Sequence, residues 1–115
     1  MSTTLIVARM NSADAPAVGE LFAESDAGEL PAMFQVQSRM LFSYHDLYFH
    51  LVQSRDALPG QVEAAREHPL FASLSRDLER YIRPYAPSWR GPRDAMASHF
   101  YTWHATEGAP TAGRP

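Results

Sequence analysis

Apolar and polar residues alternate along residues 35–53, which read QVQSRMLFSYHDLYFHLVQ. Val36, Met40 and Phe42 alternate with mostly polar neighbours before a short polar corner at residues 43–46. The same period of two resumes after the corner, in a run rich in aromatic residues. This pattern is typical of β-strands, so the segment is predicted to form a β-hairpin.

The register of this hairpin is predicted from the separation of apolar and polar side chains. A loop centred on Tyr44 and His45 would place Arg39 directly opposite His50. Directly opposed residues share one face of a sheet, so one face would be almost wholly apolar and the other would carry Arg39, Tyr48 and His50. A slip of one residue would mix the two sets, because it would bring Arg39 beside Leu51. The polar face is therefore the expected place for chemistry.

The segments on either side of the hairpin predict the remaining elements. We expect a strand over residues 4–10, a helix ending near Gly28, helices over residues 56–67 and from Pro69 to before Pro84, a loop over residues 84–94, and a last strand over residues 97–104. Ser12 or Asp14 is expected to cap the first helix, and His68 the helix that begins at Pro69. Asp26 would lie near the carboxyl end of its helix, where it should either hold its proton tightly or be drawn to a cation such as Arg39.

The predicted order of elements is strand, helix, strand, strand, helix pair, strand. It matches the βαββαβ pattern of a ferredoxin-like α+β fold, in which four antiparallel strands carry helices on one face. The open face needs cover, and a homodimer is the simplest way to bury it. We expect a single domain over residues 1–106, followed by a flexible C-terminal tail over residues 107–115.

Composition narrows the possible functions. The 115 residues are 45% hydrophobic, with a net charge of −3, which gives no electrostatic reason to expect nucleic acid or a membrane surface as a partner. Cysteine and lysine are both absent, which excludes thiol nucleophiles, disulfides and lysine Schiff bases. No signal peptide or membrane span is recognisable, so a cytoplasmic protein is expected. The histidines show no spacing typical of a metal site, and no metal is expected.

Four segments, LFAESDAGELP, RMLFSYHDLYFHLVQS, HPLF and RYIRPYAPSW, occur in this order along the chain. Together they resemble the small aromatic polyketide cyclases of the tetracenomycin type, from bacterial type II polyketide pathways. The resemblance spans residues 5–103 and is most specific at residues 45–51 and 26–31. It implies a dimeric ferredoxin-like α+β barrel that needs no cofactor. It also implies a pocket between sheet and helices, where a folded poly-β-ketone undergoes aldol cyclisation and loses water to become aromatic.

The resemblance also implies which residues act. The acid/base and oxyanion-stabilising positions of the family fall on Asp26, Arg39 and His50, while Ser25 replaces a histidine that some members carry at that position. A histidine with its ordinary pKa of about 6.5 suits removal of a proton from a methylene between two carbonyls, or return of a proton to the new alkoxide. Arg39 would stabilise the enolate or alkoxide oxygen, and Asp26 would orient its partners or share the proton transfer.

Flat side chains are the expected walls of a pocket for a planar, partly aromatic ligand. Candidates besides Ser25 are Phe34, Tyr48, Trp89, Tyr101 and Trp103. Spacing alone gives each of these a structural explanation as well, and Tyr101 and Trp103 suit core or dimer contacts.

Two other functions stay open on the sequence. One is a cofactor-independent monooxygenase that oxidises anthrones, and the other is a non-catalytic dimeric protein that binds a polyketide. The sequence also leaves open which ring closes, and whether the substrate is free or tethered to an acyl carrier protein.

Overall fold

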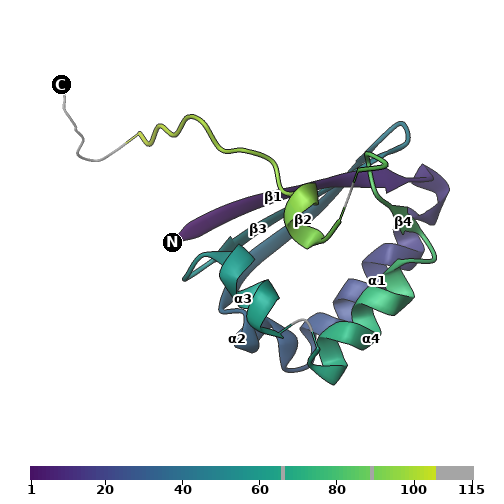
Figure 1. The fold of residues 1–115 in the computed structure, drawn as a ribbon, viewed down its shortest axis with the longest axis horizontal. Coiled ribbons are helices and arrows are strands. Elements are labelled where there is room, and N and C mark those ends of the chain that lie inside the picture. Colours follow the sequence, from purple (N-terminus) through teal and green to yellow (C-terminus); the bar gives the residue numbers. More distant parts are fainter. Residues whose placement is uncertain (66, 89, 106–115) are drawn as a thin grey trace.

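A computed structural model describes residues 1–65, 67–88 and 90–105 of the chain (Figure 1). The strands form one four-stranded antiparallel sheet in the order β2-β3-β1-β4, and α1 to α4 lie on one side of it (Figure 1). The predicted α+β class, with an antiparallel sheet and helices on one face, is confirmed. The predicted tail, residues 107–115, lies outside the described residues.

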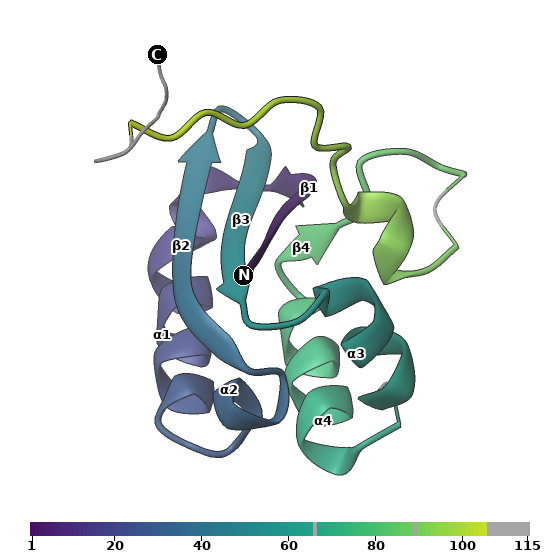
Figure 2. The same ribbon diagram turned by 90° about the vertical axis from the view of Figure 1, so that its left-hand side faces the viewer.

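The order of elements along the chain follows the prediction, with short additional helical turns. The elements are β1 (Ser2–Met10), η1 (Ser12–Asp14), α1 (Ala15–Asp26), α2 (Leu30–Met33), β2 (Val36–Tyr44), β3 (Leu47–Ser54), α3 (Leu58–Ala65), α4 (Pro69–Leu78), β4 (Ile82–Arg83) and η2 (Pro92–Ala95). Figure 2 shows α1 and α2 next to the β2-β3 hairpin, and α3 and α4 next to each other on the side where β4 lies.

The last strand is not where the sequence predicted it. The fourth strand of the sheet is the two-residue β4, which pairs with Arg9 and Met10 of β1. Met96 makes only an isolated bridge to Ile6, and residues 97–104 then leave the sheet without regular structure (Figure 1). Ala97 N still donates a hydrogen bond to Leu5 O of β1 at 2.7 Å, and no residue after Ala97 pairs with a strand in the described part of the chain.

The helix caps agree with the prediction in one case and differ in the other. His68 caps α4 as predicted, since its Nδ1 accepts a hydrogen bond from Leu70 N at 3.2 Å. Asp14 occupies the N-cap position of α1, as predicted, but its side chain makes no capping bond. The capping bond lies one turn earlier, where Asn11 Oδ1 accepts from Ala13 N at 3.0 Å at the start of the 3-10 turn that precedes α1.

The hairpin register differs from the prediction by two residues. Arg39 lies opposite Val52, and His50 lies opposite Leu41. The loop is centred one residue later than expected, and His45 in it adopts a φ of 55°. A shift of two keeps every side chain on its face, so the predicted separation survives although the predicted partners were wrong.

Two clusters of buried residues form the core between the sheet and the helices. The first contains Ala8, Met10, Val18, Phe22 and Tyr48, and the second contains Leu30, Phe34, Val52, Leu58 and Val62. The apolar face of the hairpin points the other way, with Met40 53% and Phe42 50% exposed. The face that carries His50 and Tyr48 is therefore the buried one.

Replacing Val18 with alanine tests the first cluster. Val18 is 2% exposed on α1, so loss of its two methyl groups should lower the free energy of unfolding by about 2 kcal/mol. Urea denaturation measures this change. Leu70→Ala is the control, because Leu70 is 44% exposed and its truncation should cost less than about 1 kcal/mol. Equal losses in the two variants would contradict the described packing.

Candidate active site

Three predicted catalytic residues from three elements meet in a chain of hydrogen bonds. Asp26 is the last residue of α1, Arg39 lies in β2 and His50 lies in β3. The Nε and Nη2 atoms of Arg39 donate to Asp26 Oδ2 at 3.0 Å and Oδ1 at 2.7 Å. Its Nη1 atom lies 2.9 Å from His50 Nε2. The guanidinium thus bridges the carboxylate and the imidazole.

The backbone explains why these side chains meet. Arg39 and His50 are diagonal neighbours on one face of the hairpin, a separation that long side chains bridge. Asp26 ends a helix, where the partial negative charge of the helix dipole disfavours a carboxylate. A bidentate, charge-assisted pair with Arg39 offsets this repulsion. The expectation that Asp26 is drawn toward Arg39 is therefore confirmed.

The Phe22 ring of α1 contacts both Arg39 and His50. The Cζ atom of Arg39 lies 4.9 Å from the centroid of the Phe22 ring, a cation–π contact. The same ring meets the His50 ring edge to face, with centroids 5.0 Å apart. Phe22 was not among the residues that the sequence predicted for the site. Helical periodicity can indicate that such a residue is buried, but it does not show that a cation packs on its ring.

The hydrogen bond from Arg39 determines which ring nitrogen of His50 carries the proton, and burial keeps the ring uncharged. A guanidinium has only donors, so Nε2 must offer a lone pair and the ring proton of neutral His50 sits on Nδ1. Burial, aided by the Arg39 charge, lowers the pKa of His50 to about 3. This differs from the ordinary value on which the sequence argument relied, because the buried imidazolium would lose its hydration. His50 is neutral at neutral pH.

Tyr48 lies beside His50 on the same face of β3. The two ring centroids are 6.2 Å apart, and Tyr48 is 3% exposed. Burial raises the pKa of the Tyr48 hydroxyl, and the positive charge of Arg39 only partly opposes this shift. Tyr48 is therefore a neutral phenol at physiological pH.

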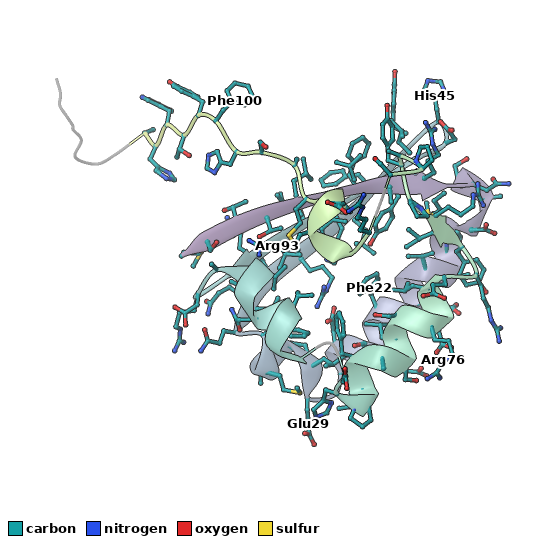
Figure 3. All side chains as sticks on the ribbon, viewed as in Figure 1. Phe22, Glu29, His45, Arg76, Arg93 and Phe100 are labelled. Atoms are coloured by element: carbon teal, nitrogen blue, oxygen red, sulfur yellow. The ribbon has the colours of Figure 1, made fainter. Side chains whose placement is uncertain are left out.

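A cavity of about 640 Å³ opens between the sheet and the helices, beside this chain of hydrogen bonds. It is lined by Ile6, Phe22, Ser25, Leu30, Phe34, Val36, Arg39, Tyr48, His50, Val52, Leu58, Val62, Phe71, Ala72, Leu74, Ser75, Arg76, Leu78, Glu79, Ile82, Ala95 and Met96. Figure 3 shows Phe22 in the space between the sheet and α1. Most of the wall is apolar, and Arg39 and His50 place polar groups within it.

Some of the predicted binding residues line the cavity and others do not. Ser25, Phe34 and Tyr48 are part of its wall. Tyr101 and Trp103 are 75% and 70% exposed on the segment after Met96, so the prediction that they line the pocket fails in this chain. Figure 3 shows their neighbour Phe100 on this segment, away from the cavity. Trp89 lies outside the described residues.

Several wall residues were missed by sequence analysis. Phe71 and Leu74 of α4 and Met96 line the cavity, and none of them was predicted to belong to the site. Periodicity identifies which face of α4 is buried, but a core and a cavity wall have the same pattern. Within the described ranges, no group of three His, Asp or Glu side chains could hold a metal ion. Over the same ranges, no helix is long and apolar enough to cross a membrane.

Comparison with known proteins places this geometry in a family. A family profile described as "Polyketide synthesis cyclase" matches residues 2–104. Tetracenomycin F2 cyclase of Streptomyces glaucescens is 42% identical over 103 residues, which cover 90% of this chain and 94% of that protein. An uncharacterised protein of Streptomyces coelicolor is 45% identical over 108 residues, covering 92% and 97%. Polyketide synthase CurG of Streptomyces cyaneus is 40% identical over 104 residues, covering 90% and 97%.

A solved structure agrees with these relatives. The structure of tetracenomycin F2 cyclase from Streptomyces glaucescens, described as a type-II polyketide cyclase, superposes with a TM-score of 0.87 at 40% identity. The match covers 92% of this chain and all of that one, 100%. The resemblance recognised in the sequence is thereby confirmed, and this chain belongs to the polyketide synthesis cyclase family of enzymes.

Proposed function

We propose that the protein catalyses the regioselective aldol cyclisation and dehydration of a poly-β-ketone intermediate, giving an aromatic ring, in type II polyketide biosynthesis. The observation that carries this proposal is the Asp26–Arg39–His50 chain, whose Arg39 and His50 lie in the wall of a mostly apolar cavity of about 640 Å³. A cavity of this size accommodates a ligand of several rings. It is mostly apolar, as the planar product requires, and polar where the reacting oxygens would lie.

The walls would act by holding one folded form of the substrate. Poly-β-ketones offer several carbon atoms that can attack several carbonyls, so selection of one conformation determines which ring closes. Phe34 and Phe71 meet edge to face, with centroids 5.4 Å apart, and provide a rigid aromatic surface at the α2–α4 side. Arg39 and His50 lie in the opposite wall, on the sheet.

Arg39 would stabilise the charge that develops during ring closure. Of its five N–H bonds, three hydrogen-bond to Asp26 and His50, leaving one on each Nη atom without a partner among the described residues. These donors can reach an enolate or alkoxide oxygen. Asp26 acts as a positioning residue, because it holds the guanidinium through Nε and Nη2 and does not line the cavity.

His50 would carry the proton. A substrate oxygen that accepts the Arg39 Nη1–H in place of His50 frees the Nε2 lone pair. His50 then takes a proton from a methylene between two carbonyls, since the negative charge that develops on the adjacent enolate stabilises the imidazolium and raises the pKa of His50 above its low value in the free protein. The resulting enolate carbon forms a bond to a second carbonyl carbon. The imidazolium returns this proton to the new alkoxide. Loss of that hydroxyl, with a proton from the adjacent carbon, releases water and gives the ring double bond.

Product analysis of three proteins tests this assignment. In a bacterial host that makes an uncyclised aromatic polyketide, the wild-type protein should produce a compound lighter by one water. His50→Ala and Arg39→Lys should each lower its yield on the order of 100-fold, since lysine cannot hold Asp26 and His50 while facing the substrate. Mass spectrometry of the extracts gives the readout.

Arg80→Lys is the matched control, because Arg80 is exposed after α4 and lies outside the cavity wall. It should behave as the wild type does. A product that gains oxygen, with oxygen consumed, would replace the cyclase by the monooxygenase. Identical products from the wild type, His50→Ala and Arg39→Lys would leave only a binding role.

The lowered pKa of His50 predicts how stability depends on pH. Both folded and unfolded His50 are neutral above about pH 6.5, and only the unfolded form binds a proton as the pH falls from there toward about 3. The free energy of unfolding should therefore decrease as the pH is lowered through this window. Between about pH 7.5 and about pH 5, urea denaturation should show about 2 kcal/mol more loss in wild type than in His50→Asn. Equal losses would place the pKa of His50 near its ordinary value.

We further propose that the protein works as a homodimer of the α+β barrel type, built on the ferredoxin-like order of strands. The side of the sheet opposite the helices carries an apolar patch, which we call the outer face: Leu5, Val7, Met40, Phe42, Leu47, Phe49 and Leu51. Nothing in the described part of the chain packs across Met40 and Phe42, each at least half exposed. Water contact with such a patch is costly, and a second copy would remove it.

The segment over residues 97–104 supports the same assembly. Phe100 is 96% exposed, and Tyr101 and Trp103 are also uncovered. The segment leaves the body on the side away from the helices, where the outer face lies (Figure 1). One chain thus has an uncovered apolar sheet face and an uncovered aromatic segment, and a second copy offers a partner for each. We place the domain at residues 1–106, with residues 107–115 as a tail that the assembly does not need.

Sedimentation velocity tests the dimer. The wild type should sediment as a dimer at micromolar concentration, and Phe42→Asp should shift it to monomer, because burying an unpaired carboxylate at an interface is strongly unfavourable. Leu70→Asp, a similar change at an exposed leucine on α4, should remain dimeric. A wild-type monomer under these conditions would overturn the assembly.

A further inference from the structure

Tyr48 has a polar atom that the packing of the protein does not use. Its ring belongs to the first core cluster beside Met10 and Phe22, yet its hydroxyl makes no hydrogen bond to any described residue. Buried tyrosines usually find a partner for this group. A ring that is only 3% exposed with a free hydroxyl is therefore unusual.

The hydroxyl is not sealed inside the core. Among the described buried side chains, Gln35 Oε1 is the polar atom that lacks both a hydrogen-bond partner and contact with open space. Tyr48 Oη has no partner among the described residues and is not one of these enclosed atoms, which indicates that it retains contact with open space. The space beside Tyr48 is the cavity that it lines together with Arg39 and His50. The hydroxyl thus opens onto the proposed substrate site.

The electrostatic surroundings make this hydroxyl a donor. Burial keeps the phenol protonated by raising the pKa of Tyr48, while the charge of Arg39 acts on it in the opposite direction. The Arg39 charge therefore acts on the Tyr48 hydroxyl, and both residues line the cavity. A phenol that stays neutral cannot serve as a base, but it can donate its proton in a hydrogen bond to an oxygen.

We propose that Tyr48 is a catalytic residue whose O–H donates a hydrogen bond to the carbonyl oxygen that Arg39 also binds. This inference rests on the cyclase function proposed above. The oxygen that becomes negative during ring closure would then receive an N–H from Arg39 and an O–H from Tyr48. A carbonyl oxygen has two lone pairs, so it can accept both. The arrangement resembles other oxyanion sites in which a tyrosine hydroxyl assists.

The proposed role of Tyr48 as a hydrogen-bond donor differs from that of an aromatic ring in the cavity wall. An aromatic wall needs the ring, whereas a donor needs the oxygen. Tyr48→Phe keeps the ring and removes only the hydroxyl, so it separates the two roles. A site built to hydrogen-bond a carbonyl also discriminates against ligands that lack one. Tyr48 would therefore select substrates with an oxygen at this carbon, besides aiding the reaction.

Tyr48→Phe should lower kcat on the order of 100-fold, as loss of one oxyanion donor does, while KM changes little. Its thermal unfolding temperature should stay equal or rise, because the removed hydroxyl has no hydrogen-bond partner among the described residues. A structural hydroxyl would give the reverse result, with stability lost and kcat kept. Tyr85→Phe is the control, since Tyr85 is 53% exposed and lies outside the cavity wall.

A binding measurement tests the donor independently of turnover. The wild-type protein and Tyr48→Phe are titrated with 2-acetylnaphthalene, an aromatic ketone, and with 2-ethylnaphthalene, which has the same shape without the oxygen. Loss of one hydrogen bond should weaken ketone binding about fivefold in Tyr48→Phe and leave 2-ethylnaphthalene unchanged. Equal ketone affinities would overturn the role of Tyr48, whether or not cyclisation is observed. Ketone selectivity without any cyclised product would instead overturn the proposed function.

Discussion

The placement of one positive charge in an apolar wall governs the candidate site. The Arg39 side chain is only 15% exposed, and a guanidinium removed from water needs compensation on every side. Asp26 supplies the opposite charge, His50 supplies a lone pair, and the Phe22 ring supplies a π face. These partners come from α1 and the hairpin, so the charge ties the helix layer to the sheet. Burial, aided by this charge, keeps His50 neutral, and the hydrogen bond from Arg39 determines which ring nitrogen carries the proton.

The hairpin serves both sides of the sheet because its side chains alternate. One set, which includes Arg39, Tyr48 and His50, faces the helices and forms the polar part of the cavity wall. The other set, which includes Met40 and Phe42, faces away and leaves an apolar surface. The proposed catalytic site and the proposed dimer interface thus share the same strands. A change in one face can therefore affect the other through the backbone that both use.

The local pattern of the sequence determined much of this protein. Alternation of period two specified the hairpin and its two faces, and it did so despite a register error, since a shift of two leaves each face unchanged. The cap at His68 followed from a side chain and a backbone group two residues apart. The attraction between Asp26 and Arg39 followed from the helix dipole. Family membership followed from four segments whose residues lie together in sequence.

Only the tertiary structure determined the features that depend on how segments far apart in the sequence pack together. Residues 97–104 have the pattern of a strand, yet the two-residue β4 supplies the fourth strand and the chain leaves the sheet after Ala97. Tyr101 and Trp103 therefore lie outside the cavity wall. The pKa of His50 falls because residues far along the chain bury it. The place of Tyr48 in the cavity wall, with no hydrogen-bond partner for its hydroxyl among the described residues, likewise depends on how the helices pack over the sheet. Periodicity predicts which way a side chain points, whereas its neighbours and hydration are set only when the whole chain has folded.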